Sequence, residues 1–204
     1  VSRGEHWAVS APIASGQKRP GRGGGFKFSL RKRFMLVYGT MGTAEENNWM
    51  RAKARYDAET FMYRGNASVD VMSDREFTLE SAKTRDVMVY GNRDINLAWK
   101  RLNTDGVIDV QRGRIQMIGA DPKVGDLVCL FCRPSVGLDT MVAYMGVSGT
   151  QAMAVAERLP IFTSGVAYPD YTLFDAQVLK LGTKAVLDAG WFDNNWKLPA
   201  RVSK

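Results

Sequence analysis

The stretch FMLVYGTMGT, residues 34–43, decides the fold. Its first five residues form a continuous apolar run, which is typical of a strand in a parallel sheet that is covered on both faces. Gly39 and Gly42 then allow a sharp turn. Thr43 and Glu46 have the spacing of a capping box, so we expect a helix to begin here with its first backbone N–H groups directed over the strand end.

The same design recurs in residues 87–92, VMVYGN. They repeat the strand and the Tyr-Gly turn, and Asn92 is the predicted cap of a helix over residues 93–102. Both helices carry a tryptophan, Trp49 and Trp99. Repeated strand–turn–helix units predict parallel neighbouring strands joined by right-handed crossovers.

A third turn of this kind follows a predicted buried strand over residues 141–145. The turn, residues 146–150, contains Ser148, which has capping-box spacing to Gln151. We therefore expect a third helix over residues 151–158.

The helix predicted over residues 44–63 has an interior face and a solvent face, and Gly65-Asn66 is its stop signal. The interior face is assigned Trp49, Ala52, Ala54, Ala58, Phe61 and Met62, and the solvent face Glu45, Arg51, Lys53, Arg55 and Glu59. Residues 68–72 alternate in polarity and predict a strand.

After Gly106 the sequence changes to short strands and turns. Strands are predicted over residues 107–110, 115–118 and 127–131, which favours an antiparallel hairpin or meander at one edge of the sheet. The predicted fold class is therefore α/β: a three-layer, flavodoxin-like or Rossmann-like fold with a mainly parallel sheet and an antiparallel edge.

The net charge of +7 at pH 7 lies in the first 33 residues. This segment holds eight of the 28 basic residues and one of the 21 acidic residues, which leaves 20 of each sign in the remainder. Because it is rich in Gly, Ser and Pro, we predict a basic arm or linker over residues 1–33, with Trp7 and Ile13 as candidate anchors, and a single α/β domain over residues 34–204.

A basic arm can bind the phosphate backbone of a nucleic acid. Few aromatic residues are interleaved with its charges, so a solvated linker is favoured and nucleic acid is not an expected partner. No apolar run approaches the roughly 18 residues of a membrane span, so no membrane interaction is expected.

The two cysteines, Cys129 and Cys132, form a C-x-x-C pattern. The pattern lies in an apolar run that predicts a strand, whereas redox motifs of this type lie at helix starts. Residues three apart on a strand face opposite sides of the sheet, and a zinc site needs about two more ligands. We therefore predict buried structural thiols.

Ligands of open parallel sheets bind beyond the carboxyl ends of the strands, where helix N-termini supply N–H donors and a partial positive charge. We expect Tyr38, Tyr90 and Met145 to lie at a common rim there, next to the three turns. The candidate ligand-binding residues are Gly39, Thr40, Gly42, Thr43, Gly91, Asn92, Ser148, Gly149 and Thr150. Glycines and caps also build ordinary strand-to-helix turns, so a purely structural role remains an alternative.

The standard phosphate-binding motifs are missing from these turns. GTMGT and GVSGT are too short for G-x-x-x-x-G-K-[ST], and no G-x-G-x-x-G follows a strand. We therefore assign no cofactor, and keep a flavodoxin-like site for FMN or a nucleotide as the alternative, with Tyr38, Tyr90 or Trp49 near the ring.

Independent catalysis is not expected. The single histidine, His6, lies in the predicted arm, so a Ser-His-Asp triad would require the arm to fold over the body. No G-x-S-x-G elbow is present, one histidine excludes an HExxH zinc site, and the carboxylates are too scattered for a pair to be named. We assign no catalytic residue and no metal site.

Four segments carry a resemblance to a known family: RFMLVYGTMGTAEENNWMRAKARYDAETFMYRGNASVDV (33–71), DVMVYGNRDINLAWKRL (86–102), SGVAYPDYTLFDAQVL (164–179) and AGWFDNNW (189–196). Together they resemble the C-terminal region of large bacterial alpha/beta-hydrolase proteins of the prolyl-oligopeptidase and esterase type. In such proteins the nucleophilic serine and its histidine belong to a separate hydrolase domain. This portion looks like an accessory α/β domain, and no catalytic residue can be carried over to it.

The resemblance implies a partner, namely a hydrolase domain of the same or an associated polypeptide, and it suggests a secreted or periplasmic location. The leading functional hypothesis is therefore a non-catalytic accessory or substrate-positioning domain of a larger serine hydrolase acting on peptides or esters. The alternative is a flavodoxin-like module that binds a phosphate-bearing small molecule.

Overall fold

The computed structural model describes residues 2–3, 6–7, 12–14 and 16–199. The strands are β1 (Ser2–Arg3), β2 (His6–Trp7), β3 (Phe34–Tyr38), β4 (Asp70–Ser73), β5 (Asp86–Gly91), β6 (Ile108–Gln111), β7 (Arg114–Met117), β8 (Lys123–Val124), β9 (Leu127–Pro134), β10 (Met141–Val147), β11 (Tyr171–Asp175) and β12 (Val186–Gly190). The helices are α1 (Ala44–Gly65), α2 (Leu97–Leu102), α3 (Thr150–Glu157) and α4 (Val178–Leu181), with the 3-10 helices η1 (Phe26–Leu30) and η2 (Gly182–Ala185).

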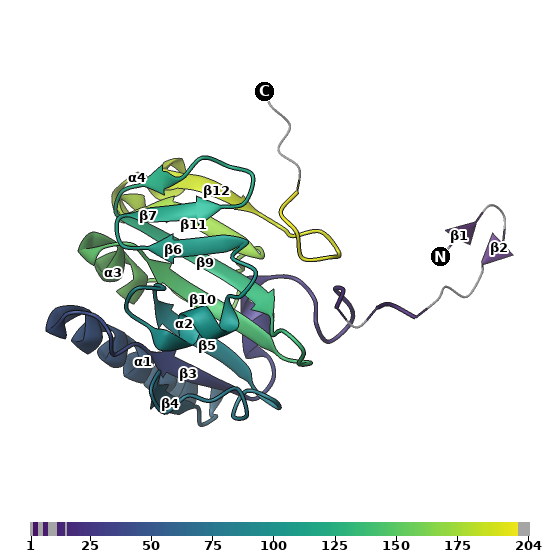
Figure 1. Ribbon diagram of the computed structural model, residues 1–204, viewed down its shortest axis with the longest axis horizontal. Helices are drawn as coiled ribbons and strands as arrows, with labels where there is room; N and C mark the ends of the chain where they lie inside the picture. The colour runs from purple at the N-terminus through teal and green to yellow at the C-terminus, as the bar shows by residue number, and fades with distance from the viewer. Residues whose placement is uncertain (1, 4–5, 8–11, 15, 200–204) are drawn as a thin grey trace.

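The centre of the fold is a seven-stranded mixed sheet with the order β12-β11-β9-β10-β5-β3-β4 (Figure 1). At one end β4, β3, β5 and β10 run parallel, as the continuous apolar runs of β3, β5 and β10 predict. Met145 pairs with Tyr90 and Val37 with Val89, so Tyr38, Tyr90 and Met145 share one rim of the sheet. The α/β class and the common rim are therefore confirmed.

The antiparallel part of the sheet differs from the prediction. Strand β9 lies inside the sheet, antiparallel to both β10 and β11, and the antiparallel edge is formed by β11 and β12. Strands β6, β7 and β8 form a separate three-stranded sheet. The placement of the antiparallel edge over residues 107–132 is therefore wrong, and the sheet is parallel only at one end.

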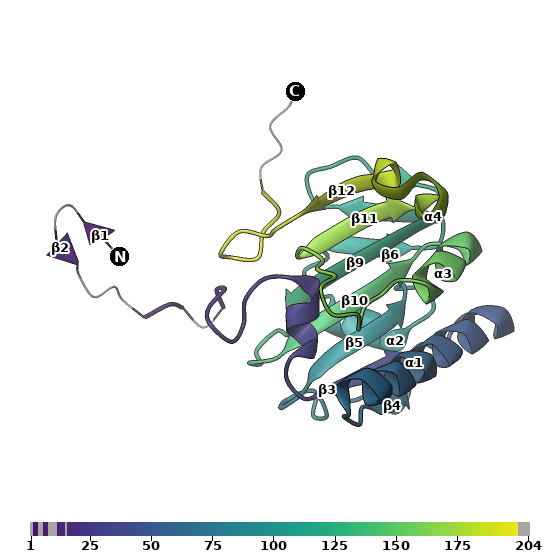
Figure 2. The same cartoon turned by 180° about the vertical axis from the view of Figure 1, so that it is seen from behind.

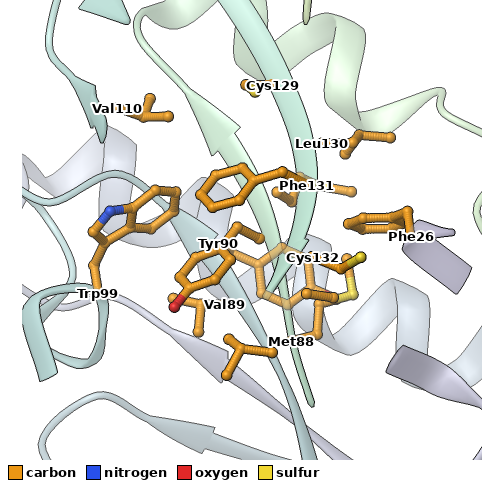
Figure 3. Packing of buried hydrophobic residues seen from close by; sticks show 14 of the residues in the cluster. Phe26, Met88, Val89, Tyr90, Trp99, Val110, Cys129, Leu130, Phe131 and Cys132 are labelled. Carbon is orange, nitrogen blue, oxygen red and sulfur yellow. The ribbon is translucent and has the colours of Figure 1, made fainter. Parts of the chain in front are cut away.

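Helices α1 and α3 cover one face of the large sheet, and helix α2 with the three-stranded sheet covers the other (Figures 1 and 2). On the α2 face, the Trp99 ring packs edge-on against Tyr144, with 4.8 Å between centroids, and Tyr144 stacks on Phe131 at 4.4 Å. Figure 3 shows Phe26 across the sheet from Trp99. Both faces of the sheet are thus closed by large apolar side chains, which fixes the register of the central strands.

Helix α1 begins where the capping box predicts. Thr43 N donates to Glu46 Oε2 at 2.7 Å, and Glu46 N donates to Thr43 Oγ1 at 3.3 Å. The helix ends at Gly65, and Asn66 follows in the left-handed conformation with φ of 48°.

The interior face of α1 is only partly as predicted. Met50, Lys53, Ala54 and Asp57 are buried, Trp49, Ala58 and Phe61 are half-buried, and Ala52 and Met62 are exposed. The assignment of Lys53 to solvent is wrong because its Nζ donates to Asp57 Oδ1 at 2.7 Å, and Tyr90 donates its hydroxyl to Asp57 Oδ2 at 2.9 Å. A hydrogen-bonded ion pair can be buried where a lone charge could not. Burial raises the pKa of the Asp57 carboxyl and of the Tyr90 hydroxyl.

Residues 16–33, which the sequence places in the arm, pack against the domain. Phe26 is fully buried, and η1 lies against β5 and β10. The buried Asp170 carboxylate accepts hydrogen bonds from Lys18 Nζ, from Gly25 N at 2.6 Å and from Phe192 N at 2.8 Å. One carboxylate therefore ties this segment to the C-terminal part of the chain.

The glycine run before η1 permits this close approach, because a Cβ on Gly24 would meet Asp170 Oδ1 at 2.9 Å and the Trp191 ring at 3.0 Å. Of the two predicted anchors, Ile13 is 51% exposed, and the Trp7 side chain lies outside the described residues.

Cys129 and Cys132 are free thiols, fully buried in β9. Burial is the largest effect on both groups and raises the pKa of each thiol far above its usual value. The prediction of buried structural thiols on a strand is confirmed.

Candidate functional site

The nine predicted site residues gather at the rim formed by the carboxyl ends of β3, β5 and β10. Gly39, Thr40, Gly42 and Thr43 follow β3, Gly91 and Asn92 lie at the end of β5, and Ser148, Gly149 and Thr150 follow β10. Asn92 Nδ2 donates to the Val147 carbonyl at 2.9 Å, which joins the second turn to the third. The structure therefore brings the three turns together.

A turn that the sequence did not single out connects them. Arg112, between β6 and β7, donates from Nη2 and Nε to the Glu46 carboxylate at 2.7 and 3.0 Å, and its backbone N–H donates to Asp94 Oδ2 at 3.0 Å. The next N–H, of Gly113, donates to the Ser148 carbonyl at 2.7 Å. The β6–β7 turn thus contacts all three strand-end turns.

Glu46 joins the first turn to the start of α1 by hydrogen bonds. Besides its bond to Thr43 N, this carboxylate receives the two-pronged Arg112 guanidinium, and the Arg112 hydrogen bond is the main reason that the pKa of Glu46 is lowered. Arg112 in turn has a raised pKa, chiefly through Glu46. A Cβ on Gly42 would meet Glu46 Oε2 at 2.6 Å, so this glycine makes room for the protein's own carboxylate.

Asp74 joins the turn after β3 to the N-terminus of α2. Its Oδ2 accepts the backbone N–H of Leu97 at 2.7 Å and that of Thr40 at 3.2 Å, and its Oδ1 accepts the Thr40 hydroxyl at 2.7 Å. Leu97 is the first residue of α2, so Asp74 lies at a helix N-terminus next to the turn after β3.

The predicted start of α2 is wrong. The cap is Asn96, whose side chain accepts from Ala98 N at 2.9 Å, and the helix begins at Leu97 rather than at residue 93. Asn92 instead accepts from Asp94 N at 2.9 Å while its amide holds Val147 O, as described above. Two asparagines of similar capping potential lie four residues apart: Asn96 caps the helix, and Asn92 joins the end of β5 to the end of β10.

Asp126, and not the predicted capping box, supplies the hydrogen-bond acceptors for the first N–H groups after the third turn. Asp126 Oδ2 accepts Gln151 N at 3.1 Å, and Oδ1 accepts Ala152 N at 2.7 Å. The Ser148 hydroxyl donates to the Gly125 carbonyl at 2.7 Å, so it does not cap α3, which begins at Thr150. A Cβ on Gly149 would meet Asp126 at 2.6 Å.

Each of the three helix N-termini at the rim therefore already carries a carboxylate of the same chain: Glu46, Asp74 and Asp126. Helix N-termini favour negative charge, and an internal carboxylate satisfies them as an external anion would. A phosphate at any of these turns would have to displace or approach a carboxylate.

Sequence reasoning missed Asp74, Arg112 and Asp126 as parts of this rim. A signal existed for Asp74, because it lies two residues after the strand predicted over residues 68–72, close to the carboxyl edge expected for a parallel sheet. Arg112 and Asp126 lie in the segment predicted as an edge, and their approach to the rim depends on the real position of β6, β7 and β9.

The His6 side chain lies outside the described residues, so the expectation that it forms no triad stays a prediction. Among the side chains that the structure describes, no group of three His, Cys, Asp or Glu residues is arranged to hold a metal ion. None of the helices within the described ranges has the length and apolar character needed to cross a bilayer. Searches of family models and of curated proteins find no match to this chain.

Proposed function

We propose that the chain is a non-catalytic accessory domain of a larger serine hydrolase acting on peptides or esters, and that it packs beside the catalytic domain and helps to position substrate. The observation that carries the proposal is that carboxylates of the same chain already occupy the helix N-termini at the rim. The end of the sheet where an α/β enzyme of this type places its ligand is instead neutralised by Glu46, Asp74 and Asp126. The resemblance of four segments to hydrolase C-terminal regions supplies the class of partner.

Residues 16–33, which pack against the domain, offer a fixed attachment for a neighbouring hydrolase domain. Asp170 holds Lys18 and Gly25 against the body, and Phe26 enters the core. A hydrolase domain joined through this segment would have a fixed point of attachment close to the sheet. Ordered attachment lowers the conformational entropy lost when two domains and a substrate come together.

The finer fold that we propose is three-layer and flavodoxin-like. The parallel strands appear in space as β4, β3, β5 and β10, which matches the 2-1-3-4 order at the start of the flavodoxin-like arrangement. This order also favours the alternative function, a module for a flavin or nucleotide, because β3 and β5 flank the switch point at which such folds bind their ligands. Asp74 opposes that alternative, since it takes the Thr40 and Leu97 N–H donors that a phosphate would use.

A fluorophosphonate probe tests the non-catalytic role directly, because it labels activated serines. The purified chain should remain unlabelled and should not hydrolyse p-nitrophenyl esters or chromogenic peptides. Labelling of one serine, with hydrolysis that the probe abolishes, would overturn the proposal.

The reading frame that encodes the chain tests the hydrolase association. A serine-hydrolase domain upstream of residue 1 is expected, and deleting residues 34–204 from that protein should lower kcat/KM for a large substrate more than for a small ester. A start codon immediately before residue 1, or equal effects on the two substrates, would contradict the substrate-positioning role.

A further inference from the structure

We propose that the domain binds a small amphipathic carboxylate in a cavity of about 580 Å³ at the opposite end of the sheet from the rim. The cavity lies between the three-stranded sheet, the end of β9 and the C-terminal loop, three parts of the chain that Figure 1 shows close together. Its volume is in the range of small-molecule sites. This site goes beyond the accessory role and does not depend on it.

The charged wall of the cavity is Arg133, which is held rigidly. It is 5% exposed, its Nη1 donates to the Trp196 carbonyl, its Nη2 donates to Asp105, and its guanidinium lies 4.8 Å from the centroid of the Phe192 ring. Three separate contacts fix this side chain, so little entropy would be lost when a ligand contacts it.

Two N–H groups of the wall have no partner. Arg133 Nε and Trp196 Nε1 are buried and make no hydrogen bond within the part of the chain that the structure describes. Both atoms are enclosed by protein, so a ligand in the cavity would meet the charges of Arg133 and Lys197 rather than these two N–H groups.

The loop that carries Trp196 is also preorganised. Trp196 has φ of 62°, a left-handed conformation that is unfavourable for a bulky residue. The Asp193 carboxylate holds the loop by accepting Asn195 N and Lys197 N, each at 2.8 Å. Strain of this kind persists only where surrounding contacts impose it, and here it shapes the wall of a cavity.

The lining defines the ligand. The charge of Arg133 is matched by Asp105, and Lys197 adds one further positive charge, so the cavity suits a single negative charge. Val107, Ile118 and Leu198 form its apolar part. A carboxylate attached to an apolar or aromatic body satisfies both parts, whereas a dianionic phosphate would match neither the charge nor the apolar lining.

A ¹H–¹⁵N NMR titration of the full chain with phenylacetate tests the site, with phenylacetamide as the neutral analogue. Phenylacetate should shift the Trp196 indole N–H signal in a saturable way, and phenylacetamide should bind at least about tenfold more weakly because it lacks the charge. Ile118→Glu places a negative charge at the mouth on a side chain that is 58% exposed, so the fold should tolerate it, and it should weaken phenylacetate binding by about tenfold or more.

The matched control is Val124→Glu, on an 81% exposed side chain of the neighbouring strand β8 that does not line the cavity. It adds the same charge to the same small sheet and should leave phenylacetate binding unchanged. The proposal is overturned if phenylacetate gives no saturable shift, if phenylacetamide binds equally well, or if Ile118→Glu has no more effect than Val124→Glu.

Discussion

Asp170→Ala should destabilise the domain more than any exposed charge deletion. Its carboxylate is fully buried and its partner Lys18 is 14% exposed, so the substitution leaves an ammonium group with little access to water. Breaking a buried ion pair from one side typically costs about 3–5 kcal/mol. The N–H groups of Gly25 and Phe192 lose their acceptor as well, so we expect the free energy of unfolding to fall by at least about 3 kcal/mol. For a domain of this size that is a fall in Tm of about 6–12 °C.

The control is Asp139→Ala, which removes the partner of the next residue in the same segment, Arg19. Asp139 is 64% exposed, and an exposed pair contributes about 1 kcal/mol or less. Urea unfolding of both variants gives the comparison, and limited trypsin digestion reports on the segment, because a detached segment exposes its basic residues to cleavage. Two results would refute the role of Asp170 in holding residues 16–33: equal stability losses in the two variants, or an Asp170→Ala variant whose stability and rate of trypsin cleavage equal those of the wild type.

Three further predictions concern two buried carboxylates, Asp86 and Asp57, and the half-buried Asp126. Burial raises the pKa of Asp86 from 3.8 to about 6, so the folded state binds more protons than the unfolded state between these values, and stability falls as the pH rises from about 4 to about 6. Asp86→Asn should remove this pH dependence and raise the free energy of unfolding at pH 7 by up to about 3 kcal/mol. Parallel pH profiles of stability for the two proteins would contradict this. Asp57→Ala should cost about 3–5 kcal/mol in urea unfolding because it strands the buried Lys53, and a loss below 1 kcal/mol would show that the pair is not buried in solution. Asp126→Ala should cost about 1–2 kcal/mol through the uncapped N-terminus of α3, with faster hydrogen exchange confined to that helix; unchanged exchange there would rule out the cap.

The sequence predicts the parallel end of the fold well because its signals are local. The apolar run at residues 34–38, the glycine turn and the capping box at Thr43 lie within a few residues of one another, and each specifies a conformation without help from the rest of the chain. The same holds for the repeat at residues 87–91.

The hairpin signals that precede β9 predict an edge strand, yet seven consecutive residues of β9 are buried. A run that is buried on both faces indicates an interior strand, and that pattern extends beyond the five residues first assigned to it.

The three turns meet at one rim of the sheet, as the sequence predicts, but the carboxylates at that rim are not foreseen from the sequence. The carboxylates at this rim come from distant parts of the chain: Asp74 caps a helix that starts 23 residues later, and Asp126 caps one that starts 24 residues later. Such caps follow no short spacing rule, since tertiary packing alone brings donor and acceptor together. Lys53 pairs with Asp57 one turn further along the same helix, but the Tyr90 hydroxyl that donates to the other oxygen of Asp57 lies on β5, so the sequence does not show that this pair is buried.

Glu46, Asp74 and Asp126 already occupy the helix N-termini at the rim. This occupation can be measured by titrating the ¹⁵N-labelled chain with inorganic phosphate and then with FMN while following the backbone amides of Thr40 and Leu97. Neither compound should give a saturable shift of these two signals. A saturable shift of both, with binding strengthened by Asp74→Asn, would show that the rim is a phosphate site and that the carboxylates do not block it.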